Sequence, residues 1–147
     1  MKILICGLPG SGKSTLAELL SESLPTAVWI NADVIRTSYN DWDFSLGGRL
    51  RQAQRMKHLA DGVVMAGKIA IADFICPTEA ARTEFNPDYV IWMDTITEGR
   101  FADTNAMFEN PTKYDYHVTQ WFDNAQVQLL PVIERYMKLC KENDTKT

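Results

Sequence analysis

The stretch Ile3–Thr15, ILICGLPGSGKST, decides the fold of this chain. Its first four residues are apolar, and the nine that follow include three glycines. An apolar run that stops at a glycine-rich loop is typical of a buried strand that turns tightly into a helix. Glycine adopts backbone angles forbidden to other residues, so successive N–H groups can point inward at an anion. The stretch therefore predicts a strand, a phosphate-binding loop and a helix.

The loop matches the nucleotide-binding pattern G-x-x-x-x-G-K-[ST] at Gly7, Gly12, Lys13 and Ser14. In such loops the lysine reaches the β- and γ-phosphates and the hydroxyl contacts Mg²⁺, while the helix adds its positive end. We therefore predict that ATP and Mg²⁺ bind here, although Thr15 alternatively serves only to start the helix. The residues expected to hold the triphosphate are Gly7, Leu8, Pro9, Gly10, Ser11, Gly12, Lys13, Ser14 and Thr15.

Apolar runs and helical spacing alternate along the rest of the chain. They predict strands at 2–6, 27–31, 68–74 and 88–94, and helices at 14–23, 46–66 and 120–141. Gly67 should cap the second helix, and Pro131 should break or kink the third. This order predicts an α/β, three-layer P-loop NTPase fold in one domain over residues 1–147, its mainly parallel sheet covered by helices on both faces. Ligands should bind beyond the carboxyl ends of the strands.

The net charge, the apolar runs and the cysteines of the chain count against several classes of protein. The formal net charge of −4 counts against a general nucleic-acid binder. No segment approaches the roughly 18 apolar residues that span a bilayer, and the first residues suggest a core strand rather than a signal peptide. Three widely spaced cysteines without a C-x-x-C pair favour neither a disulfide framework nor a zinc site. We expect a protein of the reducing cytosol.

Two carboxylates and one arginine follow the predicted strands. Asp33 and Arg36 lie in NADVIR, where a carboxylate can orient or deprotonate an acceptor hydroxyl, or hold the metal, and a guanidinium can clamp an anionic acceptor. Asp33 could instead be a helix N-cap. Asp73 ends the strand IAIAD, a pattern suited to Mg²⁺ bound through water, or to a structural role. Lys13, Asp33 and Arg36 are the catalytic candidates; Ser14, Asp33 and Asp73 are the metal candidates.

Five segments together resemble the adenylylsulfate kinase family over about residues 1–95. GLPGSGKST is a wording that this family favours, and NADVIR at 31–36 is similar to its D-G-D-x-x-R. FSLGGRLRQAQR at 44–55 is similar to F-S-x-x-D-R-x-E-N-I-R-R. AGKIAIADFICP at 66–77 is similar to A-G-x-I-V-I-x-S-F-I-S-P and is followed by Arg82. The fifth segment is the strand end at Asp94–Thr95.

The resemblance implies an acceptor and a set of roles. The acceptor is the 3′-hydroxyl of adenylyl sulfate, whose adenine stacks on Phe44 while arginines grip its sulfate and phosphate groups. These arginines are Arg36, Arg49 and Arg55. The pocket is lined by Phe74, Ile75, Cys76 and Pro77. Arg100 would clamp the leaving phosphate. The plainer alternatives are core packing for Phe44, a solvated helix face for Arg49 and Arg55, and a surface role for Arg100.

The sequence also departs from the family pattern. Asn31 replaces the first aspartate, Ala32 a glycine, and Gln54 an arginine, and the segment after Asp94 is shorter and more acidic than the family's lid. Other acceptors therefore stay open: a hydroxyl on a modified nucleic-acid base, a nucleoside or another small molecule. A nucleotide-binding module without catalysis is the third alternative. The residues that hold the adenine of ATP and the oligomeric state stay open, with a homodimer as one option.

Overall fold

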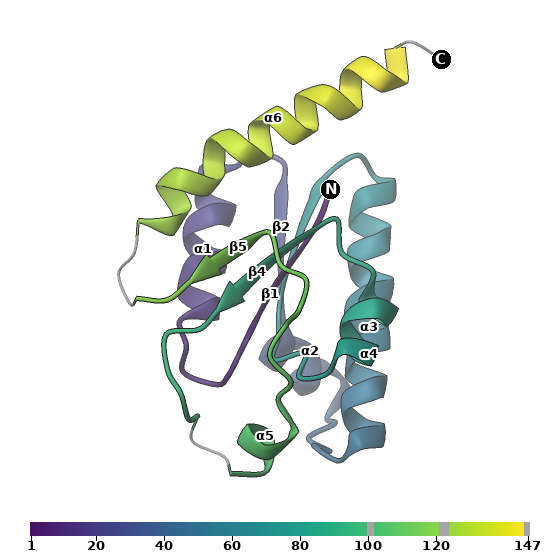
Figure 1. Cartoon of the computed structure of the whole chain (residues 1–147). Coiled ribbons are helices and arrows are strands. Elements are labelled where there is room, and N and C mark those ends of the chain that lie inside the picture. The colour runs from purple at the N-terminus through teal and green to yellow at the C-terminus, as the bar shows by residue number, and fades with distance from the viewer. Residues whose placement is uncertain (100–101, 121–123, 146–147) are drawn as a thin grey trace.

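The computed structural model in Figure 1 describes residues 1–99, 102–120 and 124–145, with the backbone alone at residue 103 and over 140–145. Its centre is a five-stranded sheet in the order β2-β3-β1-β4-β5, and every strand pair is parallel. The strands are β1 (Lys2–Gly7), β2 (Ala27–Asn31), β3 (Ile69–Asp73), β4 (Tyr89–Met93) and β5 (Tyr116–Val118). The expected parallel α/β fold is confirmed.

Helices cover both faces of this sheet. Figure 1 shows α1 (Lys13–Ser23) and α6 (Ala125–Thr145) on one side, with α3 (Leu46–Met65) and α4 (Glu79–Phe85) on the other. The short helices α2 (Ala32–Tyr39) and α5 (Ala102–Met107) lie toward the end where the strands finish. Within the described ranges, no helix is long and apolar enough to cross a membrane.

Two apolar clusters hold the three layers together, because successive residues of a strand point to opposite faces. Ile3 and Ile5 of β1 pack toward Leu20 of α1 and Leu129 of α6. The neighbouring residues Leu4 and Cys6 face the other cluster, which contains Met56 of α3 and Phe85 of α4. A strand buried on both faces has no polar alternation, and this explains why β1 is apolar from Ile3 to Cys6.

Two expectations from the sequence concern where helices end or bend, at Gly67 and at Pro131. Gly67 caps α3 as predicted: its φ is 78°, and the N–H groups of Gly67 and Lys68 donate to the Val64 and Val63 carbonyls. Of the break or kink expected at Pro131, the break is wrong, since α6 runs through this residue. Pro131 lies on the exposed side of α6, where water can solvate the carbonyl that loses its N–H partner, while Leu129 and Ile133 keep the helix packed.

The crevice that can bind a ligand follows from the strand order. β1 lies between β3 and β4, so the loops after β1 and β3 are neighbours at the carboxyl edge. The first loop leads to α1 on one face and the second to α4 on the opposite face. Loops that diverge in this way leave a crevice beyond the sheet, as expected for parallel α/β proteins.

Candidate active site

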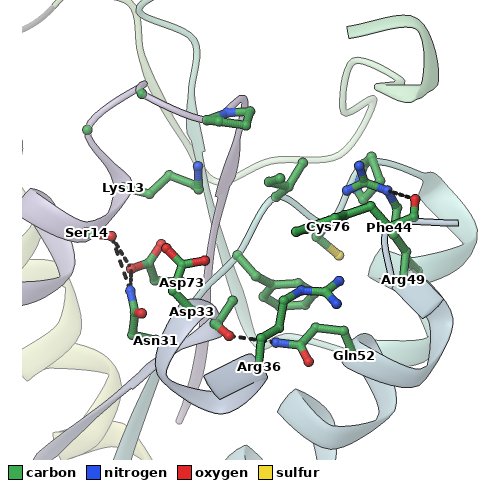
Figure 2. A pocket seen from close by; sticks show the side chains of 18 of the residues that line it. Lys13, Ser14, Asn31, Asp33, Arg36, Phe44, Arg49, Gln52, Asp73 and Cys76 are labelled. Atoms are coloured by element: carbon green, nitrogen blue, oxygen red, sulfur yellow. Dashed lines mark hydrogen bonds between the residues drawn. The ribbon is translucent and has the colours of Figure 1, made fainter. Parts of the chain in front are cut away.

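A cavity of about 330 Å³ opens at this crevice, between the phosphate loop on one side and α2, α3 and the loop after β3 on the other. Figure 2 shows Lys13, Ser14 and Asp73 across the cavity from Phe44 and Arg49. The phosphate-loop residues that line it are Pro9, Gly10, Gly12, Lys13, Ser14 and Thr15. Gly7, Leu8 and Ser11 of the same loop are buried and do not line it.

The loop presents backbone N–H groups at the start of α1. Gly12 is the N-cap with φ 97°, a left-handed conformation that favours glycine, and no side chain caps the helix. The first-turn N–H groups are therefore available to an anion, together with the positive end of the helix dipole. The Lys13 ammonium is mostly buried beside them and donates to the Leu8 carbonyl at 2.9 Å. The Lys13 ammonium and the backbone N–H groups lie close together, and such a cluster of donors suits a phosphate group.

Two of the three metal candidates, Ser14 and Asp73, meet where α1 begins and β3 ends. The Ser14 hydroxyl donates to Asp73 Oδ2 at 2.8 Å, and Asp73 is buried at the tip of β3. A hydroxyl and a carboxylate are the oxygen ligands that Mg²⁺ prefers, usually completed by water and substrate phosphates. These residues fit Mg²⁺.

Helix α2 positions Asp33 and Arg36. Its N-cap is Asn31, whose Oδ1 accepts from the Val34 N–H at 3.1 Å, so the alternative of Asp33 as N-cap is wrong. Asn31 takes that place because it is the last residue of β2 and still has an extended backbone. Asp33 lies exposed in the first turn, and both Asp33 and Arg36 line the cavity.

Arg36 and Phe44 form one unit on the acceptor side. The Arg36 guanidinium donates from Nη1 to the Asp41 and Asp43 carbonyls at 3.0 and 3.2 Å and lies 4.4 Å from the centre of the Phe44 ring. Burial lowers the pKa of Arg36 from its ordinary value, but a guanidinium stays charged at neutral pH. The Phe44 side chain is 48% exposed, so it is a surface of the cavity rather than a core residue.

The two remaining arginines, Arg49 and Arg55, differ in whether they line the cavity. Arg49 is buried and lines the cavity, which contradicts a solvated face; it donates from Nε to the Phe44 carbonyl at 3.0 Å and from Nη2 to Thr104 of α5 at 2.7 Å. Arg55 does not line the cavity. It pairs with Asp41 at 2.7 Å and stacks on Tyr39 at 4.4 Å. Its position indicates a role in holding the 39–43 segment.

That segment lies tightly against α3, and Gly48 makes the approach feasible. A Cβ atom at Gly48 would lie 2.1 Å from the Asp43 carbonyl oxygen. Ser45 caps α3 by accepting from the Gly48 N–H at 3.2 Å. Hydrogen bonds from Ser45 and then from Arg51 lower the pKa of Asp43 to about 2. The segment that carries Phe44 is thus fixed at both ends.

The loop after β3 forms the floor of the acceptor side. Phe74, Ile75, Cys76 and Pro77 all line the cavity, and Cys76 has a positive φ of 45°. Arg82 holds this loop: its Nε donates to the Cys76 carbonyl at 3.0 Å and its Nη2 to the Glu109 carbonyl at 2.6 Å. Arg82 is only 5% exposed and also pairs with Glu79 at 2.7 Å.

Two residues near the cavity were not among the sequence candidates. Arg82 has no direct contact with the cavity, so only its distance from the loop in the family motif could have indicated it. Gln52 lines the cavity and donates to the Ala32 carbonyl at 2.9 Å, which ties α3 to the start of α2. Arg100, expected to clamp the leaving phosphate, lies outside the described residues.

The family model described as adenylylsulphate kinase matches residues 1–90. An adenylyl-sulfate kinase of Shewanella denitrificans is 33% identical over an alignment of 105 residues, and the match covers 68% of this chain and 48% of that protein. The chain therefore spans about half the length of that curated relative.

Solved structures resemble the chain in fold. The Mycobacterium tuberculosis APS kinase CysC in complex with AMPPNP and APS superposes with a TM-score of 0.79 at 20% identity, over 90% of this chain and 96% of that chain. A hexameric APS kinase from Thiobacillus denitrificans gives a TM-score of 0.72 at 22% identity, over 92% of this chain and 29% of that chain.

Proposed function

Because this chain belongs to the adenylylsulfate kinase family, we propose that it transfers the γ-phosphoryl group of ATP to the 3′-hydroxyl of adenylyl sulfate. One observation carries the proposal. A single cavity has a phosphate-binding loop on one side and, on the other, an exposed carboxylate, two guanidinium groups and an aromatic ring. The relatives named above are an adenylyl-sulfate kinase and an enzyme that binds APS with a nucleotide analogue, and this supports the same substrate class.

The acceptor side matches the chemistry of adenylyl sulfate. The exposed Phe44 ring offers a surface on which adenine can stack. Arg36 and Arg49 lie 4.4 and 5.4 Å from that ring, close enough to attract the anionic groups of the same molecule. Asp33 lines the cavity from the first turn of α2 and would orient the attacking hydroxyl and accept its proton.

The phosphate side would hold ATP. Backbone amides at the start of α1 and the Lys13 ammonium neutralise the triphosphate, and transfer depends on alignment rather than on covalent catalysis. Ser14, Asp73 and Asp33, which all line the cavity, would hold Mg²⁺, which when bound neutralises phosphate charge.

A second cavity, of about 200 Å³, adjoins Gly12 and Thr15 on the other side of the loop. Leu16, Met93 and Val118 supply its apolar walls, and the amide side chains of Gln120 and Asn124 border it. An apolar slot with amides that both donate and accept hydrogen bonds suits a purine base. We assign the adenine of ATP to this cavity.

The test supplies the purified chain with Mg²⁺ and ATP labelled at the γ-phosphate. One reaction contains adenylyl sulfate, a matched reaction contains AMP, and a third contains hydroxymethylated DNA. The proposal expects label on adenylyl sulfate, with little on AMP because it lacks the sulfate. Label on DNA alone would favour the nucleic-acid alternative. Calorimetric ATP binding without transfer to any acceptor would favour a non-catalytic module.

A further inference from the structure

Asn31 and Asp73 lie opposite each other at the ends of neighbouring strands, in register. The Asn31 amide donates from Nδ2 to Asp73 Oδ2 at 2.9 Å, and the Ser14 hydroxyl donates to the same oxygen at 2.8 Å. The Trp29 indole N–H also points to it, at 3.3 Å. Three donors from β2 and α1 thus converge on one buried carboxylate oxygen, which fixes its position.

The Asn31 side-chain amide also contacts Ser14 and the first turn of α2. Its Nδ2 lies 3.2 Å from Ser14 Oγ, and its Oδ1 accepts from the Val34 N–H and so caps α2. An amide has a donor and an acceptor on one side chain, whereas a carboxylate can cap a helix but cannot donate. Asn31 therefore joins Ser14 and Asp73 to the helix that carries Asp33.

Positions 31 and 73 are direct neighbours across β2 and β3, and their side chains meet beside Ser14. One of them is an amide and the other a carboxylate, so the pair brings one N–H donor and one negative charge to this point. Exchanging the two side chains would keep the same charge and the same donor between the same two strands.

We propose that Asn31 is a positioning residue and that Asn31 and Asp73 act as one unit, which supplies a single carboxylate beside Ser14 from β3 and fixes it with an amide from β2. The chemical group served is a divalent cation, so the inference rests on the proposed function. One negative charge is the essential property of the unit. Either β2 or β3 can provide this negative charge.

The experiment compares the chain with Asn31→Asp, Asp73→Asn and the exchanged double variant Asn31→Asp/Asp73→Asn. Asn31→Asp places two carboxylates together, and Asp73→Asn leaves none. We expect each single variant to lose at least about tenfold in kcat/KM for ATP, the scale for residues that orient metal ligands. The double variant is expected to recover to within about threefold of the unsubstituted chain.

Binding of Mn²⁺ alone, measured as the loss of the free-ion EPR signal, gives a readout that a purely structural role would not change. Asn31→Asp should bind Mn²⁺ about tenfold or more tightly than the unsubstituted chain, because two carboxylates face the ion. Asp73→Asn should bind it more weakly, and the double variant should return toward the original affinity. Asn86→Asp, which adds the same charge at the exposed end of α4, is the matched control and should change neither readout.

The unfolding temperature without ligand is measured for the unsubstituted chain, the two single variants and the double variant. This measurement still tests the proposal if a single variant is too unstable for the activity assay. The double variant should unfold closer to the unsubstituted chain than either single variant. Losses that simply multiply in the double variant, or a double variant that fails to fold, would overturn the proposal. A chain that transfers no phosphate would defeat the proposed function, while the Mn²⁺ and unfolding measurements would still decide whether the two residues act as a unit.

Discussion

The phosphate loop takes nine consecutive residues, 7–15, whereas the acceptor side of the same cavity draws its side chains from α2, α3 and the loop after β3. The loop binds through backbone N–H groups that the local conformation already directs at one point. The acceptor side depends on arginines that nearby carbonyl groups hold in place, as with Arg36, and on bonds to residues far away in the sequence. Arg49 donates to Thr104, and Arg82, which holds the loop after β3, donates to the Glu109 carbonyl.

This difference predicts how the two sides respond to substitution. A change in the loop should remove function and leave the fold intact, because the loop adds little to the apolar clusters. Changes on the acceptor side should divide into those that weaken acceptor binding and those that loosen the scaffold.

Lys13→Ala should reduce phosphoryl transfer to background, a loss above about 10²-fold, because no other side chain of the loop can neutralise the β- and γ-phosphates. Far-UV circular dichroism should stay unchanged. Lys68→Ala, at an exposed lysine beyond α3, is the control and should keep full activity. Substantial turnover in Lys13→Ala would remove the loop from the centre of the mechanism.

Asp33→Asn should lower kcat by about 10²-fold, the usual contribution of a general base, with a much smaller change in KM for ATP. Steady-state rates over a range of both substrates measure the two effects separately. Glu84→Gln, an exposed carboxylate on α4, is the control. A normal kcat in Asp33→Asn would leave Asp33 with no part in proton transfer.

Arg82→Met should destabilise the chain by about 2–4 kcal/mol, since it leaves the buried Cys76 carbonyl and the partly buried Glu109 carbonyl without their charged donor. Urea unfolding measures the change. Arg135→Met on the exposed face of α6 should stay within about 0.5 kcal/mol. An Arg82 variant as stable as the control would contradict the scaffold role.

Arg55→Gln should leave KM for adenylyl sulfate within about twofold, because Arg55 pairs with Asp41 outside the cavity. Arg36→Gln should raise the same KM by about tenfold or more through loss of a charge-assisted contact. Equal effects of the two substitutions would show that the ion pair of Arg55 opens when the acceptor binds.

Low pH should slightly reduce the contribution of the 41–45 segment to the free energy of unfolding. The folded-state pKa of Asp43 is about 2, below the unfolded value of about 3.9, so the folded chain binds fewer protons in this interval. Stability from Asp43 is present above pH ~4 and is lost as the pH falls toward ~2. Asp43→Asn should remove this part of the pH dependence in urea unfolding, a small effect because the carboxylate is largely exposed.

Part of the candidate site was accessible from the sequence because its chemistry is local. The phosphate loop, Asp33 and the loop after β3 each lie directly after an apolar strand, and in a parallel sheet such positions meet at one edge. The exact partners of Arg36, Arg49 and Arg55 were not accessible. The same residue type in one helical region can line a cavity or pair with a neighbouring carboxylate, and spacing alone does not distinguish these outcomes.

The sequence by itself determined the alternation of buried strands with helices, the glycine-rich anion site and the family, because these depend on contacts between residues close in the chain. Only the tertiary structure decided that α6 continues through Pro131, that Asn31 caps α2, and that Asn31 and Asp73 share one carboxylate position. The shared position of Asn31 and Asp73 depends on strand order, the continuation of α6 depends on its packing against the sheet, and the cap of α2 depends on the residue at which β2 ends.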